Sequence, residues 1–391
     1  MIIGFSVHGF KSLVDFSLDE TTGMDNFTCL VGLNGAGKSS VLQSLDFASH
    51  LVRGDINSWL SKRGWSVSDL HSKLSSTSNI IIGITVRLES GLLLNWVGSF
   101  NRSSLSCTVE RIFNAVEKNL FNLAKGRYSV LDGPPSKVDF NYTGSILSAL
   151  KDDALSPEII EVRNIISNIR SLELLSPHLM RYSLREAATD IGTGGEKLSP
   201  FLYSIKGKER EKLTSLLREF YPSVVDFKVK QERAGWKKLS IIEKFNGELV
   251  ETDAKHVNDG LLRILAILAQ ASSGNATLLF DEVENGVNPE IVERLVHVLQ
   301  NTGQQVIVTT HSPMILNYLS DEVAKKSVHF VYRTFDGGTR SRPLFSVPRM
   351  EKKLTIMGPG EAFVDTSLGE LTSECAKLDA DEISTQTNGA M

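Results

Sequence analysis

The feature that most constrains this chain is the run Gly32-Leu33-Asn34-Gly35-Ala36-Gly37-Lys38-Ser39, which has the spacing G-x-x-x-x-G-K-S. Glycines at these positions let the backbone curl so that successive N–H groups can point at a phosphate. Lys38 would bring positive charge to the β- and γ-phosphates, and the Ser39 hydroxyl would bind Mg²⁺. An apolar strand pattern, "NFTCLVG", precedes the run and a helical pattern follows it. The expected phosphate contacts are Asn34, Gly35, Ala36, Gly37, Lys38, Ser39 and Ser40.

Two buried strand patterns downstream end in polar side chains. "TLLF" leads into Asp281 and Glu282, which could hold Mg²⁺ through water and polarise the attacking water, respectively. One helix later, "VIVTT" leads into His311, whose neutral imidazole could sense the γ-phosphate because it both donates and accepts hydrogen bonds. Each pattern alone is common in proteins without such a role. Their order after the phosphate loop favours the catalytic interpretation.

The order of strand and helix patterns predicts an α/β fold with a parallel sheet covered by helices. Residues 80–112 have the pattern of a strand meander that flanks the nucleotide. Residues 114–171 are predicted to be mostly helical and to form an inserted arm or lid that determines partner choice. The last run, "LDADEISTQTNGAM", is acidic and without periodicity, so we expect it to be disordered.

Composition restricts the class of protein. The 391 residues are 41% hydrophobic, and three cysteines match no metal or redox spacing, as in a reducing compartment. No stretch is apolar enough for a membrane span, so we expect a cytoplasmic protein without a membrane partner. The net charge is −4, with seven acidic residues and one lysine from Glu361 onward, which leaves +2 for the rest. This balance gives no simple argument for nucleic acid, and it does not exclude it.

The motifs resemble those of a known family. Gly32–Ser39 resembles a Walker A motif, Leu278–Glu282 a Walker B motif with its catalytic glutamate, and Thr310–Ser312 the switch-histidine loop of ABC-type ATPases. The runs "GFKSL", "DEVENGVNPE" and "TTHSPMIL" look like RecF, SMC and the predicted ABC-type "AAA family" ATPases found with OLD-type nucleases in bacterial defence operons. The resemblance covers most of residues 1–75 and 170–335 and is specific only in the motifs.

The resemblance implies a P-loop NTPase with an ABC-ATPase head, a mixed flanking sheet and a helical insertion. It divides the chain into four parts: residues 1–113 and 172–350 form the head, 114–171 the arm, and 351–391 an extension with the acidic tail. It also implies ATP and Mg²⁺ as cofactors.

The family's signature sequence contacts the ATP of the opposite subunit, and Asn258, Asp259 and Gly260 occupy its place here. Asn258 stands where the family has serine. An amide can still donate to a phosphate oxygen, but the replacement of the serine argues against efficient hydrolysis. The alternative is an ordinary core helix with Asp259 as its N-cap. Residues 284–289 would cross a dimer interface or form a plain turn.

Two further family features are less defined in this chain. The run "LELLSPHLMRY" occupies the region of the family's glutamine loop but contains no glutamine. Lys11 would reach the nucleotide or remain a solvated surface lysine.

Three functions are compatible with these patterns. The first is an ATP-hydrolysing sensor or scaffold, a homodimer or higher oligomer through its ATP interface, that controls a separate effector such as a nuclease in anti-phage defence. The second is a RecF/SMC-like DNA-binding ATPase of repair or chromosome maintenance. Its candidate DNA contacts, "KGKEREK" and "RAGWKK", are favoured as solvated faces. The third, a small-substrate P-loop kinase, lacks a visible acceptor site.

Overall fold

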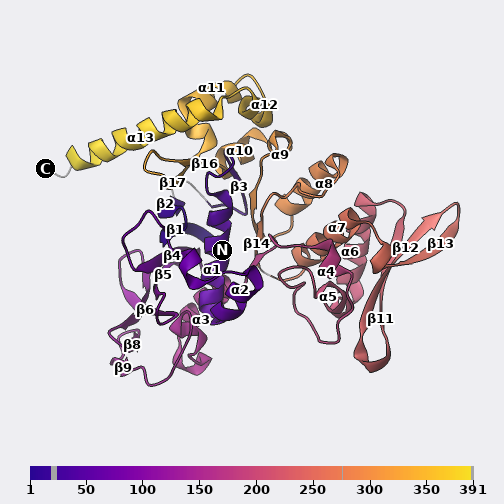
Figure 1. Cartoon of the computed structure of the whole chain (residues 1–391), viewed down its shortest axis with the longest axis horizontal. Helices are drawn as coiled ribbons and strands as arrows, with labels where there is room; N and C mark the ends of the chain where they lie inside the picture. The colour runs from indigo at the N-terminus through magenta and orange to yellow at the C-terminus, as the bar shows by residue number, and fades with distance from the viewer. Residues whose placement is uncertain (19–23, 275, 389–391) are drawn as a thin grey trace. The chain divides into compact units, whose positions relative to one another are not determined.

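The computed structural model describes residues 1–18, 24–274 and 276–388 (Figure 1). The chain divides into two compact units. Unit 1 comprises Met1–Ile169 and Ile307–Met391, and unit 2 comprises Arg170–Val306. No helix among these described residues is long and apolar enough to cross a membrane.

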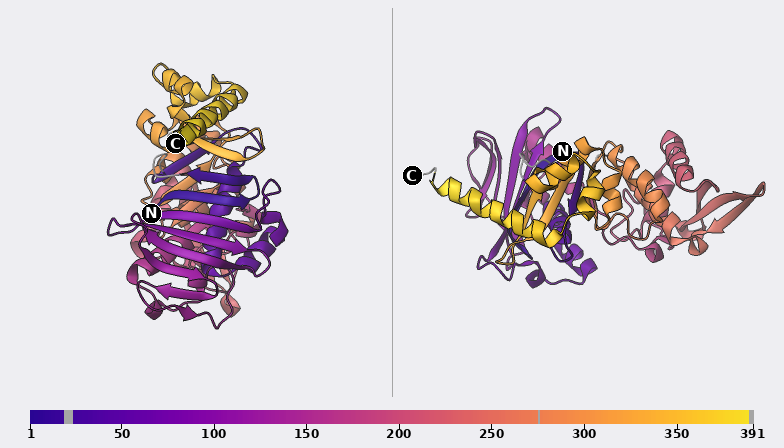
Figure 2. Two further views of the ribbon diagram at one scale, coloured as in Figure 1. Left: turned by 90° about the vertical axis from the view of Figure 1, so that its left-hand side faces the viewer. Right: turned by 90° about the horizontal axis from the view of Figure 1, so that it is seen from above.

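An antiparallel sheet of eight strands, in the order β2-β1-β4-β5-β6-β7-β8-β9, lies in unit 1, and the left view of Figure 2 shows its strands side by side. The predicted meander over residues 80–112 is confirmed, since β4 pairs with β5 and β5 with β6. The bounds are β1 Ile2–Phe10, β2 Leu13–Leu18, β4 Asn79–Arg87, β5 Leu93–Asn101, β6 Ser106–Asn114, β7 Asn119–Ala124, β8 Arg127–Val130 and β9 Ser136–Lys137.

Helix α1 (Lys38–Arg53) packs its apolar face on this sheet. The ring of Phe47 lies 5.6 Å from that of Phe10 on β1 and 5.2 Å from that of Phe100 on β5, measured between centroids. All three side chains are fully buried, so each contributes about 2–3 kcal/mol of apolar burial. This packing fixes the helix that begins at the phosphate loop.

One carboxylate is buried in the same sheet. Glu110 accepts hydrogen bonds from Trp96 Nε1 at 2.8 Å, Ser145 Oγ at 2.5 Å and Ile146 N at 3.1 Å. Burial raises its pKa to about 7, although the three donors act in the opposite direction.

A second sheet of unit 1 has β3 (Phe27–Val31) at its centre. β16 (Val328–Arg333) pairs with β3 in parallel and with β17 (Thr339–Pro343) in antiparallel fashion. β15 (Gln305–Thr309), which contains the unit boundary, is the neighbour of β3 on the other side. The remaining helices of unit 1 are α2 Ile56–Arg63, α3 Pro157–Ser167, α9 Pro313–Asn317, α10 Asp321–Ser327, α11 Pro348–Leu354, α12 Pro359–Val364 and α13 Leu368–Asn388.

Unit 2 combines helices with two sets of strands. β10 (Ile169–Ser171) is the neighbour of β14 (Thr277–Phe280), and an antiparallel sheet contains β11 (Val224–Gln231), β12 (Lys237–Phe245) and β13 (Glu248–Asp253). Its helices are α4 Pro177–Met180, α5 Leu198–Ser204, α6 Gly207–Phe220, α7 Asp259–Ala271 and α8 Pro289–Gln300. The predicted α/β fold is confirmed, whereas the four-part division at residues 113, 171 and 350 stays a prediction.

The prediction of a mostly helical segment over residues 114–171 is wrong for its first half. Residues 119–130 form the hairpin of β7 and β8, which extends the eight-stranded sheet. Lys125 and Gly126 have φ values of 50° and 69° at its turn, as two-residue hairpin turns require. In the second half, α3 is the only α-helix that the structure describes.

The prediction of a disordered tail is also wrong, because α13 extends to Asn388. Leu371 and Cys375 on this helix are fully buried. Asp379 accepts hydrogen bonds from the Tyr332 hydroxyl at 2.8 Å and forms an ion pair with Arg342 at 2.7 Å, so the acidic tail has a cationic partner on β17. Residues 389–391 of the predicted tail lie outside the described residues.

Candidate functional site

The phosphate loop lies between β3 and α1 in unit 1, as the strand, loop and helix pattern predicts. Gly32 and Gly37 have φ values of 151° and 111°. A Cβ at Gly32 would collide with the carbonyl oxygen of Val331, and one at Gly37 with the Thr339 hydroxyl. Both positions therefore require glycine.

The β16–β17 hairpin holds this loop from a distant part of the chain. The Thr339 hydroxyl donates to the Ala36 carbonyl at 2.9 Å, and Arg333 Nε donates to the Gly35 carbonyl at 2.9 Å. Sequence reasoning missed both residues. Their partners are backbone carbonyls some 300 positions away, and Gly337-Gly338 signals only a turn.

The side chains of Lys38 and His311 lie close together at the loop. Lys38 Nζ donates to the carbonyls of Gly32 at 2.9 Å and Leu33 at 3.1 Å, and it lies 3.5 Å from His311 Nδ1. The Thr310 N–H donates to the Leu30 carbonyl at 3.2 Å, which fixes the chain before the histidine to β3. The lysine is buried, so the loop already carries the charge that a phosphate would need.

The other predicted loop residues differ in their exposure. Asn34 and Gly35 are exposed, and Ser39 and Ser40 are half-buried in the first turn of α1. Ala36 is buried and uses its carbonyl oxygen to accept from Thr339.

Lys11 is not a freely solvated side chain. Its Nζ donates to Gln43 Oε1 on α1 at 2.7 Å and lies 3.4 Å from the centroid of the Trp65 ring. Its φ of 48° is rare for a residue with a Cβ. A direct role at the nucleotide stays a prediction.

In unit 2, Asp281 and Glu282 follow β14 directly, as the sequence predicts. Glu282 has a φ of 48°, a left-handed conformation that costs about 1 kcal/mol or more in a residue with a side chain. The Asn285 N–H donates to the Glu282 carbonyl at 2.8 Å and closes the turn. Such strain is frequent at catalytic positions, where neighbouring structure maintains it.

The signature segment is also in unit 2. Asn258, and not the predicted alternative Asp259, caps α7, because Asn258 Oδ1 accepts from the Leu261 N–H at 2.8 Å. Asp259 is the first helical residue and forms an ion pair with Arg181 at 2.5 Å. Arg181 also donates to the Val257 carbonyl at 2.8 Å, so it holds the segment on both sides of the cap.

Gly260, two residues after the cap, lies close to the loop of residues 284–289. A Cβ at Gly260 would lie 3.2 Å from the Tyr221 hydroxyl and 3.7 Å from the Gly286 carbonyl oxygen. Burial raises the pKa of Tyr221, so its hydroxyl remains a donor at neutral pH. The loop of residues 284–289 ends at Asn288, which caps α8 by accepting from the Glu290 N–H at 3.1 Å.

The two basic stretches of unit 2 approach one aromatic ring. Lys206 Nζ lies 4.2 Å and Lys237 Nζ 5.7 Å from the centroid of Tyr203. Lys237 Nζ also donates to the Arg185 carbonyl at 2.6 Å, and Arg210 forms an ion pair with Asp226 at 2.8 Å. Part of this positive charge is therefore engaged within the unit.

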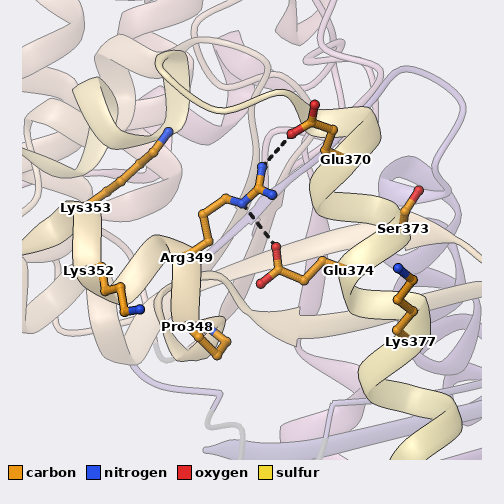
Figure 3. Close-up of a pocket in the computed structure, with 8 residues that line it drawn as sticks. All are labelled: Pro348, Arg349, Lys352, Lys353, Glu370, Ser373, Glu374 and Lys377. Atoms are coloured by element: carbon orange, nitrogen blue, oxygen red, sulfur yellow. Dashed lines mark hydrogen bonds and ion pairs between the residues drawn. The ribbon is translucent and has the colours of Figure 1, made fainter.

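A groove in unit 1 is lined by residues of α11 and α13. It has a volume of about 780 Å³ and lies between α11 and α13, where Arg349 forms ion pairs with Glu370 and Glu374 (Figure 3). Over residues 1–18, 24–274 and 276–388, no group of three or more His, Cys, Asp or Glu side chains could hold a metal ion.

Sequence and structure comparisons agree with these motifs. Residues 27–317 match the family described as "AAA domain, putative AbiEii toxin, Type IV TA system". The chain belongs to this family. The match confirms the AAA-type nucleotide-binding domain that the resemblance implied. Among curated proteins, no sequence matches it.

The fold of this AAA family member is similar to that of SMC heads. A structure of an SMC head bound to the C-winged helix domain of ScpA aligns with a TM-score of 0.51 at 15% identity, over 87% of this chain and 96% of that one. SMC heads of Pyrococcus furiosus, bound to the C-terminal domain of ScpA, and of Thermotoga maritima align with TM-scores of 0.49 and 0.44. Their identities are 13% and 14%, over 90% and 88% of this chain and 99% and 98% of theirs.

Proposed function

We propose that this AAA family member binds ATP at the phosphate loop of unit 1 and hydrolyses it. The observation that carries the proposal is the buried Lys38 ammonium, bonded to two loop carbonyls and 3.5 Å from His311 Nδ1. A phosphate oxygen that replaces those carbonyls gains a charge-assisted hydrogen bond. The imidazole beside it can donate to the terminal phosphate.

Glu282 polarises the attacking water as that water displaces ADP from the γ-phosphorus. Ser39 and Asp281 provide a hydroxyl and a carboxylate, the hard oxygen ligands that Mg²⁺ prefers, and the bound ion would neutralise charge on the phosphates. The left-handed backbone at Glu282 supports this role, because local strain of this kind is a feature of active sites.

We further propose that two copies face each other across ATP, with Asn258, Asp259 and Gly260 of one copy covering the nucleotide of the other. The output is conformational and controls a separate effector, such as a nuclease in anti-phage defence in the cytoplasm. Two findings support a partner-directed output. The family description names a toxin of a toxin–antitoxin system, and one similar SMC head binds a domain of ScpA.

The test is the solution mass of Glu282→Gln by light scattering, with and without Mg²⁺ and ATP. We expect a change from monomer to dimer on adding ATP, since the variant binds nucleotide and cannot turn it over. A mass that ignores ATP would contradict ATP-driven assembly. Phosphate release by the wild type, without a second substrate, tests hydrolysis and excludes a kinase.

A second candidate function is ATP-dependent DNA binding. The approach of Lys206 to the Tyr203 ring favours it, because a cation beside an aromatic ring suits a nucleic-acid backbone and its bases. A steep decrease of DNA affinity with salt concentration would support this candidate.

A further inference from the structure

Arg263 is a cation without a partner beside the signature segment. It lies in the second turn of α7, four residues after Asp259 and therefore on the same helical face. Its Nε atom is buried and makes no hydrogen bond, and none of the residues in the described ranges pairs with its guanidinium group. Burial without a counter-charge lowers the pKa of Arg263.

The nearest acid along the helix does not neutralise Arg263. Asp259 has the i,i+4 spacing for an ion pair with Arg263, but its carboxylate lies 2.5 Å from Arg181. An unpaired, partly buried guanidinium is destabilising relative to a neutral side chain, so folding alone gives no reason to retain it. A ligand anion would supply the missing counter-charge.

Arg263 lies close to two segments of the chain. A Cβ at Gly286 would lie 3.8 Å from Arg263 Cδ, and one at Gly260 would lie 3.7 Å from the Gly286 carbonyl oxygen. Arg263 therefore lies where the start of α7 meets the loop after Glu282. Asn258, which replaces the family's serine, uses its amide oxygen as the helix cap. Arg263 is the only cationic residue between Asn258 and Arg263 itself.

We infer that Arg263 binds the terminal phosphate of the ATP held by a second copy of this chain. A guanidinium group binds phosphate oxygens in bidentate fashion and stays charged at neutral pH, which a serine hydroxyl cannot do. This role rests on the proposed function, since it needs two copies facing each other across ATP. Arg263 is then the group that makes the departure at Asn258 compatible with hydrolysis.

The experiment is complementation between two inactive variants. Lys38→Ala removes the phosphate-loop cation and Arg263→Gln the trans cation, and each alone is expected to release phosphate at least about a hundredfold more slowly than the wild type. In a mixture, half of the dimers contain one copy of each variant and one intact site, so activity should recover to about a quarter of the wild-type value. A mixture as inactive as its components would mean that Arg263 acts within its own copy and would overturn the inference.

Two measurements separate this role from a structural one. Arg263→Gln should bind a fluorescent ATP analogue as the wild type does and melt at the same or a higher temperature, because an uncompensated buried charge is removed. Arg294→Gln, on the exposed face of α8 in the same unit, is the matched control and should hydrolyse ATP normally. A lower melting temperature for Arg263→Gln with unchanged hydrolysis per folded molecule would overturn the inference.

If the proposed function itself is wrong, the experimental result is different. In that case the wild type itself releases no phosphate and its mass ignores ATP, and the role of Arg263 is rejected with it. An active wild type together with an active Arg263→Gln rejects only the role of Arg263.

Discussion

The phosphate loop of unit 1 and the signature segment of unit 2 both precede a helix, yet they are held differently. The cation of the loop, Lys38, has two carbonyl acceptors, and Thr339 and Arg333 hold the loop from outside. At the signature segment the acid Asp259 is paired, whereas the cation Arg263 is not. The cation of the loop is therefore paired within its own unit, whereas Arg263 Nε has no hydrogen-bond partner among the described residues.

The largest effect that sharpens this comparison is expected from Glu282→Gln. Loss of the general base should slow phosphate release by about 10²–10⁴-fold. ATP affinity should remain within about twofold, because an amide of the same shape does not alter the phosphate loop. Single-turnover phosphate release and calorimetric titration measure the two quantities. Equal losses in both would show that Glu282 holds the site together and does not act on water.

Lys38→Ala should weaken ATP binding at the phosphate loop and leave the signature segment unchanged. Removal of charge-assisted hydrogen bonds to the β- and γ-phosphates costs about 3 kcal/mol, so ATP should bind about a hundredfold more weakly. Calorimetric titration measures this loss. Lys325→Ala, an exposed lysine on α10 of the same unit, is the control and should bind ATP as the wild type does. A variant of Lys38 with unchanged affinity would contradict the position assigned to the triphosphate.

Glu110, the buried carboxylate of unit 1, should affect the stability of the fold without affecting ATP binding. Glu110 has a folded-state pKa of about 7, above its ordinary value, so it takes up a proton on folding. Its contribution to stability is fully present below about pH 4.5 and is lost as pH rises through about pH 7. Between about pH 6 and about pH 8 the free energy of unfolding should fall by about 1 kcal/mol.

Glu110→Gln should remove this pH dependence and leave ATP affinity at fixed pH unchanged, which chemical denaturation at several pH values and calorimetric titration check. A wild type whose stability does not decrease over that range would show that the carboxylate is ionised throughout.

Thr339→Val tests whether the hairpin positions the loop. Valine has the same shape but leaves the Ala36 carbonyl without its donor, at a cost of about 1 kcal/mol. ATP should bind about fivefold more weakly, with little change in the rate of a saturated enzyme. Ser341→Ala is the matched control, because Ser341 is a half-buried residue of the same strand whose hydroxyl donates to the Ser17 carbonyl and not to the loop. If both variants weaken binding equally, the effect belongs to the strand and not to the Thr339 hydroxyl.

The smallest effect is expected from Arg181→Gln in unit 2. Its ion pair with Asp259 is partly exposed and contributes less than about 1 kcal/mol. Binding of ATP to one copy should not change, whereas the ATP-driven increase in mass should weaken by a few fold, because an uncompensated Asp259 would repel phosphate. A loss of ATP affinity in one copy would instead show that the signature segment also contributes to ATP binding at the phosphate loop.

Local patterns made the phosphate loop, the strand before Asp281 and the strand before His311 predictable from sequence. Each depends on a few adjacent residues and on chain order. The catalytic roles of Glu282, His311 and Lys38 remain predictions. Thr339 and Arg333 were not predictable, since they contact backbone carbonyls that carry no side-chain signal.

The two wrong predictions have a related physical cause. In both cases, contacts with distant parts of the chain determine the local structure. Residues 119–130 form strands because β7 pairs with β6. Helix α13 is held by Asp379, which accepts a hydrogen bond from Tyr332 and forms an ion pair with Arg342. An acidic run without periodicity looks disordered when its cationic partner lies 37 positions earlier in the chain.

The parallel pairing of β3 with β16 has a consequence for biosynthesis. Val328 pairs with Cys29, so the strand that leads into the phosphate loop acquires this neighbour only 328 − 29 = 299 residues after it is translated. Synthesis proceeds at about 5–20 residues per second, so the loop waits tens of seconds for its support. A ribosome that stops early therefore releases a chain with the nucleotide motif in its sequence but without the hairpin that shapes it. Such fragments should be substrates for chaperones and proteases and should not turn over ATP.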